Sequence, residues 1–183
     1  SQYIGNDRIP NAGIIYSKDH GKTWNISTLA RTNTTESQVA EVEPGVLMLN
    51  MRDNRGGSRA VSTTTDLGKT WKEHESSRTA LQEPVCMASL ISVKAKENVL
   101  GKDILLFSNP NDAKNRHSIT IKASLDGGVT WLPENQLLLD AGWGWGYSCL
   151  TMIDKETVGI LYESSVAHMT FQAIKLKDII KTK

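Results

Sequence analysis

The chain has 183 residues, of which 39% are hydrophobic and 22% are charged, and this is ordinary for a globular domain with a core of its own. The formal net charge of +1 and the pI near 7.7 give no overall attraction to nucleic acid or to anionic membranes. No apolar run is long enough to cross a bilayer, and the first eight residues lack the charged start and apolar centre of a signal peptide.

Short segments rich in β-forming residues follow one another along the chain, separated by turn residues. This spacing is typical of a sandwich or of a barrel-like repeat fold. We find no long amphipathic helix, and we expect the basic tail over 176–183 to be frayed or weakly helical. The predicted strands are residues 13–16, 46–52, 59–63, 84–93, 103–108, 118–123, 148–153, 157–162 and 169–174.

The two cysteines, Cys86 and Cys149, lie far apart in the sequence and have no other metal-ligating residues beside them. We expect two buried free thiols, and a disulfide between them is the alternative. The sequence predicts no metal site and no cofactor site.

An eight-residue pattern, Ser-x-Asp-x-Gly-x-Thr-Trp, occurs at 17–24, at 64–71 with Thr in place of Ser, and at 124–131. We expect the Asp carboxylate to accept backbone N–H groups two residues on, the Gly to adopt a left-handed conformation and the Trp to be buried. We therefore interpret the three copies as structural hairpin turns. Binding of calcium or sugar at the copies is the alternative.

A motif that returns at this interval marks one supersecondary unit used several times, and propeller blades of roughly 40–50 residues fit it best. Three copies account for three blades, whereas closed propellers have about 4–8. The chain is therefore predicted to be half of a β-propeller. We expect an N-terminal half to lie on another chain, to have been removed by proteolysis, or to be replaced by a second copy, because open blade edges are avoided in proteins.

Five polar residues do not fit a structural role in the repeats. Arg52 and Glu163 end apolar strands, and Arg116 precedes one. Tyr147 follows the aromatic-glycine string over 142–146, and Glu36 stands 16 residues before Arg52. Taken singly, each fits an ordinary role, as a solvated arginine or a core tyrosine. Together they fit the opening of the central channel of a propeller, where charged side chains at strand ends could bind an anion. Two arginines can grip a planar carboxylate, and a Glu beside a Tyr can activate the phenol.

These residues and the repeats resemble the C-terminal half of the catalytic domain of bacterial exo-α-sialidases (neuraminidases, glycoside hydrolase family 33), and the resemblance covers 1–183. The repeats match the Asp boxes of that family. Four segments match in order: 36–52, 105–110 with the following Arg116, 146–151 and 159–163. Asp boxes occur in other propellers too, so the four segments make the resemblance specific.

The resemblance implies an all-β, six-bladed β-propeller, of which the chain covers about half, and retaining hydrolysis of terminal sialic acids from glycans without cofactor or metal. Tyr147 would be the nucleophile and Glu36 its general base. Arg52 and Arg116 would bind the substrate carboxylate, and Glu163 would orient a partner arginine. A neutral phenol suits an anomeric carbon that already carries a carboxylate. Sialidases are therefore an exception among glycosidases, most of which use a pair of carboxylates.

The resemblance also implies sialylated glycans and the N-terminal half of the propeller as partners, and a secreted, periplasmic or outer-surface location in a bacterium. Trp143 and Trp145 would stack on sugar at the pocket rim or, alternatively, pack in the core. The family's general acid has no counterpart in this chain. Arg8 stands in an Arg-Ile-Pro tripeptide like that of the family's first arginine, but it precedes a box of the C-terminal half, so we interpret it as a loop residue.

The 183 residues alone are therefore predicted to be nearly inactive. A non-catalytic sialoglycan-binding propeller is the alternative function, and Tyr147 and Glu36 argue against it because a lectin needs no activated nucleophile. A purely structural repeat protein would leave the five polar residues unexplained. A trans-sialidase would share the same residues, so the sequence leaves open the choice between hydrolase and trans-sialidase, as well as the linkage preference.

Overall fold

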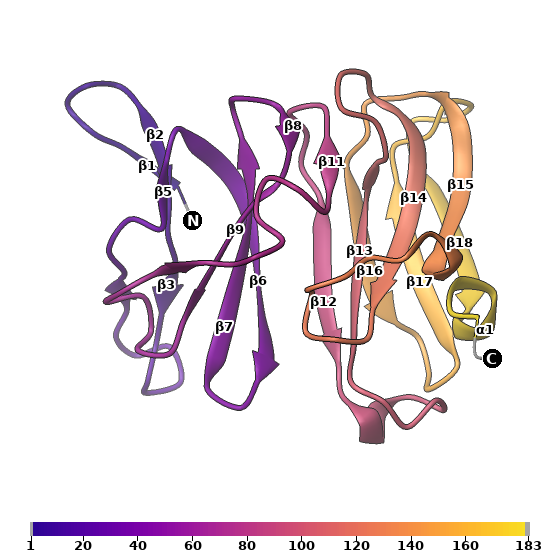
Figure 1. Ribbon diagram of the computed structural model, residues 1–183, viewed down its shortest axis with the longest axis horizontal. Coiled ribbons are helices and arrows are strands. Elements are labelled where there is room, and N and C mark those ends of the chain that lie inside the picture. The colour runs from indigo at the N-terminus through magenta and orange to yellow at the C-terminus, as the bar shows by residue number, and fades with distance from the viewer. Residues whose placement is uncertain (1, 182–183) are drawn as a thin grey trace.

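The computed structural model describes residues 2–181. Its strands form antiparallel sheets that stand side by side, and Figure 1 shows the chain running through them from β1 at the left to β18 at the right. The four larger sheets thus follow one another in chain order, and short two-stranded pairs interrupt the first and the second. The all-β fold class predicted from the sequence is confirmed.

The first sheet has the order β1-β2-β5 and is followed by the β3–β4 hairpin, which carries the first box. These strands are β1 (Gln2–Ile4), β2 (Pro10–Ala12), β3 (Ile15–Tyr16), β4 (Asn25–Ile26) and β5 (Arg31–Thr32). The second sheet has the order β10-β9-β7-β6, and a short β8–β11 pair lies beyond it. These strands are β6 (Thr34–Glu43), β7 (Val46–Asp53), β8 (Gly57–Ser58), β9 (Ala60–Thr64), β10 (Lys72–Glu73) and β11 (Gln82–Glu83).

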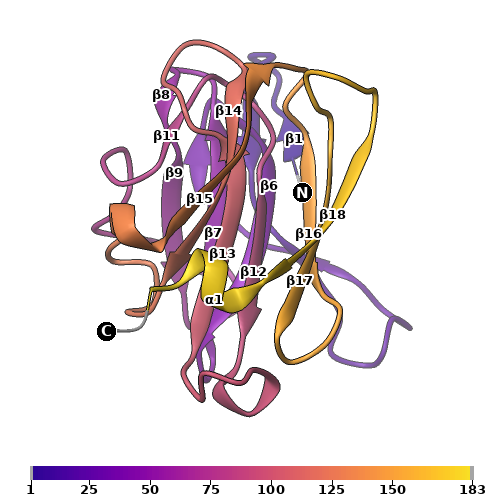
Figure 2. The ribbon, with the colours of Figure 1, turned by 90° about the vertical axis from the view of Figure 1, so that its right-hand side faces the viewer.

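The third sheet has the order β12-β13-β14-β15 and the fourth the order β16-β17-β18. The strands are β12 (Ser89–Val93), β13 (Ile104–Pro110), β14 (His117–Ser124), β15 (Gln136–Trp143), β16 (Ser148–Met152), β17 (Thr157–Tyr162) and β18 (Thr170–Lys175). Single turns of 3₁₀ helix occupy Ala95–Glu97 and Pro133–Asn135, and α1 (Leu176–Ile179) ends the fold. Figure 2 shows α1 as the element nearest the viewer on that side, and its buried Leu176 and Ile179 join the adjoining core.

The core lies in layers between neighbouring sheets because β13 is buried on both faces. Leu105 and Phe107 pack with residues of the second sheet, whereas Ile104 and Leu106 pack with residues of the fourth. Successive side chains of a strand point to opposite faces, so one strand serves both layers. Neighbouring sheets are therefore stacked through shared apolar layers.

The fourth sheet has an apolar face that no element within residues 2–181 covers. Cys149, Leu161 and Phe171 are directly opposite one another on β16, β17 and β18, so they share one face. Leu161 is 40% exposed and Phe171 is 60% exposed. The prediction of two buried thiols is wrong for Cys149, which is exposed, whereas Cys86 is buried; both are free.

The three boxes are turns, as predicted, but their hydrogen bonds differ from the expected ones. In the first box the Asp19 carboxylate accepts the backbone N–H of Thr23 at 2.8 Å and its hydroxyl at 2.6 Å, four residues on rather than two. The other two boxes repeat these bonds. Bonds from the Thr side chain and backbone lower the pKa of Asp19 to about 2. The Gly of each box has a positive φ, as predicted.

Burial of the box tryptophans is confirmed for only one copy. Trp131 is 7% exposed and packs edge-on against Phe107, with ring centroids 5.8 Å apart. Trp24 is 63% exposed, because its box belongs to the two-stranded hairpin at one end of the row of sheets. The predicted strand over 84–93 is also too long: it begins at Ser89, and the segment before it is a loop.

Lys122 is buried in the layer between the second and third sheets. Its ammonium nitrogen lies 5.7 Å from the centre of the Phe107 ring, and no carboxylate of the described residues pairs with it. Burial lowers the pKa of Lys122 to about 7. A charged amine at this position is therefore destabilised by desolvation.

Replacing Lys122 by Met is expected to raise the free energy of unfolding by about 1–4 kcal/mol at pH 7. The folded-state pKa of about 7 lies below the ordinary value of 10.5, so the unfolded chain binds the proton more tightly between those two pH values. The unaltered protein therefore gains stability as the pH rises from 7 toward 10. Urea unfolding at pH 6, 8 and 10 should show the advantage of Lys122→Met shrinking, while the exposed Lys155→Met stays neutral; a constant advantage would contradict this account.

Candidate active site

The five polar residues predicted to form a site all stand at the same ends of their strands. Glu36 lies near the start of β6, and Arg52 lies near the end of β7, which is antiparallel to β6. Arg116 and Tyr147 directly precede β14 and β16, and Glu163 directly follows β17. Five strands of the second, third and fourth sheets thus deliver these side chains to one edge of the stacked sheets.

Tyr147, Glu36 and Arg52 contact one another directly. The Tyr147 hydroxyl donates to Glu36 Oε1 at 2.5 Å, and Arg52 Nη1 pairs with Glu36 Oε2 at 2.5 Å. The same Arg52 nitrogen donates to the Tyr147 hydroxyl oxygen at 3.2 Å. Glu36 and Tyr147 are 111 residues apart in the sequence, so only the stacking of the second and fourth sheets on either side of the third brings them together.

Arg116 is held by two backbone carbonyls. Its guanidinium donates to the carbonyl of Trp145 at 3.0 Å and to the carbonyl of Val85 at 3.1 Å. The guanidinium carbon lies 6.0 Å from the centre of the Tyr147 ring. No carboxylate within residues 2–181 neutralises Arg116, so its positive charge is available to an anion beside Tyr147.

Glu163 supports Tyr147 from the neighbouring strand. Glu163 Oε2 accepts the backbone N–H of Tyr147 at 3.0 Å, and the N–H of Glu163 donates to the carbonyl of Tyr147 at 3.0 Å. Since one carboxylate oxygen is used in this way, the other oxygen remains for a further donor. The family resemblance implied that Glu163 orients an arginine. Among the described residues Glu163 instead contacts the Tyr147 backbone, and its orientation of an arginine stays a prediction.

The phenol of Tyr147 is kept protonated by its surroundings. Partial burial and the hydrogen bond to Glu36 raise the pKa of Tyr147, and this outweighs the opposing effect of Arg52. A neutral phenol that donates to a carboxylate at 2.5 Å can lose its proton to that carboxylate as it attacks an electrophile. The geometry is therefore that of a nucleophile with an attached base.

Two hollows adjoin these residues, each of about 310 Å³. One is lined by Tyr147, Glu163 and the apolar side chains of the uncovered fourth-sheet face. The other is lined by Trp143 and Trp145, with the loop over 164–168 opposite. The two indole rings are 59% exposed and meet edge-on at 5.4 Å, so the alternative of core packing is wrong for them, and stacking on sugar stays a prediction.

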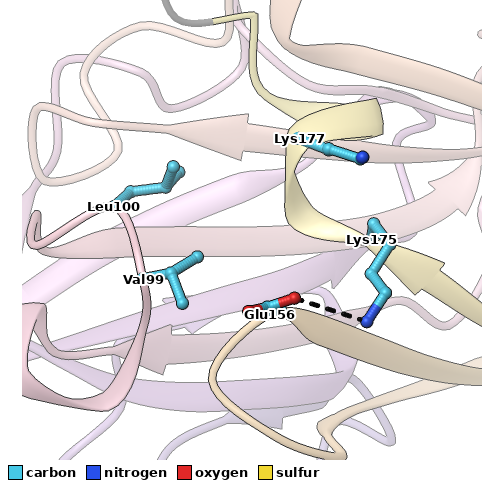
Figure 3. A pocket seen from close by; sticks show the side chains of 5 residues that line it. All are labelled: Val99, Leu100, Glu156, Lys175 and Lys177. Atoms are coloured by element: carbon cyan, nitrogen blue, oxygen red, sulfur yellow. Dashed lines mark ion pairs between the residues drawn. The ribbon is translucent and has the colours of Figure 1, made fainter.

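A third hollow, of about 240 Å³, lies at the other end of β17 and has no part in this arrangement. Figure 3 shows its lining, in which Glu156 and Lys175 form an ion pair at 3.5 Å near Val99. Glu156 directly precedes β17 and Glu163 directly follows it, so the length of a six-residue strand, about 20 Å, separates this hollow from Tyr147.

Sequence reasoning missed the buried residues behind the two arginines. Arg59 and Glu83 are fully buried and form an ion pair at 3.5 Å. Val85, whose carbonyl holds Arg116, has a φ of 52°, which is a strained conformation for a β-branched residue at a cost of about 1–3 kcal/mol. The sequence feature that could have indicated them is the Glu83-Pro84 pair at the start of an apolar run, but this pattern is equally typical of a surface turn.

Arg8 is exposed in the loop between β1 and β2, and no hydrogen bond or ion pair within the described range links it to the five site residues. A search of residues 2–181 finds no cluster of three side chains suited to bind a metal ion. Among the same residues, no helix has the length and apolar character needed to span a membrane.

Comparison with known proteins matches residues 3–160 to the model of the BNR repeat-like domain. The chain is 78% identical over 181 residues to a sialidase of Bacteroides fragilis. This match covers 99% of this chain and 33% of that protein. It is 34% identical over 152 residues to a sialidase of Micromonospora viridifaciens, covering 81% of this chain and 23% of that protein. The chain thus spans about a third or less of the length of these relatives.

Solved structures agree with this assignment. The Hadza microbial sialidase Hz136 matches 98% of this chain and 35% of its own, with a TM-score of 0.95 and 74% sequence identity. A Trypanosoma rangeli sialidase matches 96% of this chain and 28% of its own with a TM-score of 0.74, and at 22% identity this likeness concerns the fold alone. The chain therefore belongs to the sialidase family and carries its BNR repeat-like domain.

Proposed function

We propose that the chain is part of an exo-α-sialidase that releases terminal sialic acids from glycans with retention of configuration. The contact that carries this proposal is the 2.5 Å hydrogen bond from the Tyr147 hydroxyl to Glu36. It supplies a nucleophile whose proton has a ready acceptor. Arg52 and Arg116 beside it supply the positive charge that an anionic sugar needs.

In the first step the Tyr147 oxygen attacks the anomeric carbon while its proton passes to Glu36. The bond to the glycan breaks, and the leaving oxygen takes a proton from a general acid on the part of the protein outside this chain. In the second step water attacks the same carbon and gives a proton to the general acid, which lost its own in the first step, while the bond to Tyr147 breaks and Glu36 returns the proton to the phenolate. Two inversions at one carbon give retention.

The pair of arginines explains why a phenol would serve better than a carboxylate. Arg116 is oriented by two carbonyls and has no counter-ion among the described residues, so a substrate carboxylate can bind to it. Arg52 also holds Glu36 and touches the Tyr147 oxygen, so it stabilises negative charge as that charge develops on the phenol. An anionic nucleophile would be repelled by the same substrate carboxylate.

The remaining blades complete the site in this proposal. The chain would supply about half of a six-bladed propeller, and the first arginine and the general acid would come from the other half. Two observations support this: the apolar face around Leu161 and Phe171 is uncovered, and one oxygen of Glu163 is left for a further donor. The arginine that Glu163 orients would then enter the hollow between Glu163 and Tyr147.

Trp143 and Trp145 would contact the sugar that carries the sialic acid. The Trp145 carbonyl holds Arg116, so the indole side chains stand beside the proposed binding site for the carboxylate. Exposed indoles give sugars an apolar face on which to stack. This role extends the proposal to the glycan beyond the scissile bond.

Labelling with a 2,3-difluorinated sialic acid tests the proposal, because one of the related structures is described as a covalent intermediate with such a compound. In the complete catalytic domain we expect the mass of one fluorosialyl group to appear on the peptide that contains Tyr147. A label on Glu36 would overturn the assignment of the nucleophile. Binding of sialosides without label or hydrolysis would favour the alternative of a glycan-binding propeller.

A further inference from the structure

We propose that Glu83 is a positioning residue that fixes Arg52 and Arg116 relative to each other. Its kinetic consequence rests on the proposed function. Arg52 and Arg116 belong to different sheets. Their relative position depends on a link between two backbone segments: the one that carries Arg52 and the one whose carbonyl holds Arg116. Glu83 is the buried side chain that joins them.

The two oxygens of the Glu83 carboxylate hold one segment each. Oε1 accepts the backbone N–H of Asp53, which directly follows Arg52, at 3.0 Å. Oε2 accepts the backbone N–H of Cys86 at 2.8 Å. The side chain is fully buried, so neither bond competes with solvent.

The second of these bonds fixes the carbonyl that holds Arg116. Val85 stands between Glu83 and Cys86, and its carbonyl accepts Arg116 Nη2 at 3.1 Å. The φ of 52° at Val85 is unfavourable for a β-branched side chain and persists only where neighbouring contacts impose it. The bond from Cys86 to Glu83 is one such contact, and its loss would let Val85 relax and its carbonyl turn away.

Arg59 completes the arrangement by neutralising Glu83 and joining the same two segments from the other side. Its Nη1 donates to the carbonyl of Cys86 at 2.7 Å, and its Nε donates to Asn50 Oδ1 on β7 at 2.7 Å. Burial lowers the pKa of the Arg59 guanidinium, and the charge of Glu83 opposes this effect. The ion pair is therefore a brace between β7 and the loop before β12.

The test is Glu83→Gln in the complete catalytic domain. Gln has one acceptor oxygen and so can hold only one of the two N–H groups, while its volume is the same. We expect kcat/KM for a sialoside to fall about 10²-fold, the order that a misplacement of about 1 Å gives. Affinity for free sialic acid should fall as well, because the grip on its carboxylate is lost.

Leu90→Ala is the matched control, since Leu90 is equally buried, lies on β12, and touches none of these bonds. It should lower the free energy of unfolding at least as much as Glu83→Gln and leave kcat/KM and sialic acid affinity near their original values. Amide hydrogen exchange should accelerate at Asp53 or Cys86 in Glu83→Gln and at neither in Leu90→Ala. Equal kinetic losses in the two variants, or unchanged exchange and kinetics in Glu83→Gln, would overturn the proposal.

A failure of the proposed function gives a different result. The unaltered complete domain would then release no sialic acid, whereas the exchange at Asp53 and Cys86 would still report whether Glu83 joins the two segments. Sialoside kinetics therefore test the proposed reaction, and amide hydrogen exchange tests the role of Glu83 independently of it.

Discussion

Replacing Tyr147 by Phe in the complete catalytic domain is expected to lower kcat for sialoside hydrolysis by at least about 10³-fold, as removal of a nucleophile does in other enzymes. The substitution removes one oxygen and, with it, the hydrogen bond to Glu36 at 2.5 Å and the contact from Arg52. The ring remains, so the cation–π contact with Arg116 is kept. Binding of the substrate carboxylate should therefore change much less than kcat, and KM and kcat measured with sialyllactose will separate the two.

Tyr162→Phe is the control for this prediction, because Tyr162 lies on β17 of the same sheet and its hydroxyl accepts a bond from Gln172 at 2.9 Å. It loses one hydroxyl and one hydrogen bond without touching the site, and its kcat should be unchanged. Tyr147→Phe activity within tenfold of the unaltered domain would show that another group attacks the anomeric carbon. Loss of substrate binding in Tyr147→Phe would show that the hydroxyl holds the arginines rather than reacting.

The parts of the fold that the sequence predicted are those determined by local chemistry. The Asp, Gly and Thr of each box lie within a few residues of one another, so the turn depends on nothing distant. Apolar segments such as Thr157–Tyr162 were predicted at their observed bounds, because apolar and β-branched residues are concentrated in them. β6 was missed as a strand because Thr34–Glu43 is rich in polar residues and only Ala40 and Val42 of its inner face join the core.

The family resemblance supplied the residues of the candidate site and the pairing of Glu36 with Tyr147, but it did not predict the contact of Arg52 with Tyr147 or the two carbonyls that hold Arg116. Glu36 and Tyr147 meet only because their two sheets stack on either side of a third, and no local pattern encodes the register of that stacking. The brace of Glu83 and Arg59 was missed for a related reason. A charged residue in a strand or turn is usually solvated, and only the burial of both partners shows that they pair.

The chain alone is expected to hydrolyse sialosides at a rate many orders of magnitude below that of the complete domain. General acid catalysis contributes about 10²–10⁴-fold, and the proposed general acid and first arginine lie outside these 183 residues. The uncovered apolar face around Leu161 and Phe171 also adjoins Tyr147, so water enters the site where the remaining blades would exclude it. Water weakens the electrostatic contacts of Arg52 and Arg116 with the substrate.

The measurement compares the chain alone, the remaining part of the protein alone, and both expressed together, with a fluorogenic aryl sialoside and with sialyllactose as substrates. The aryl group leaves more easily and needs less protonation than a sugar hydroxyl, so the deficit of the chain alone should be larger with sialyllactose. Turnover by the joined parts, abolished when the chain carries Tyr147→Phe, would establish a site shared between them. Full activity of the chain alone would contradict the placing of the acid elsewhere, and a stable complex that binds but does not hydrolyse either substrate would indicate a glycan-binding propeller.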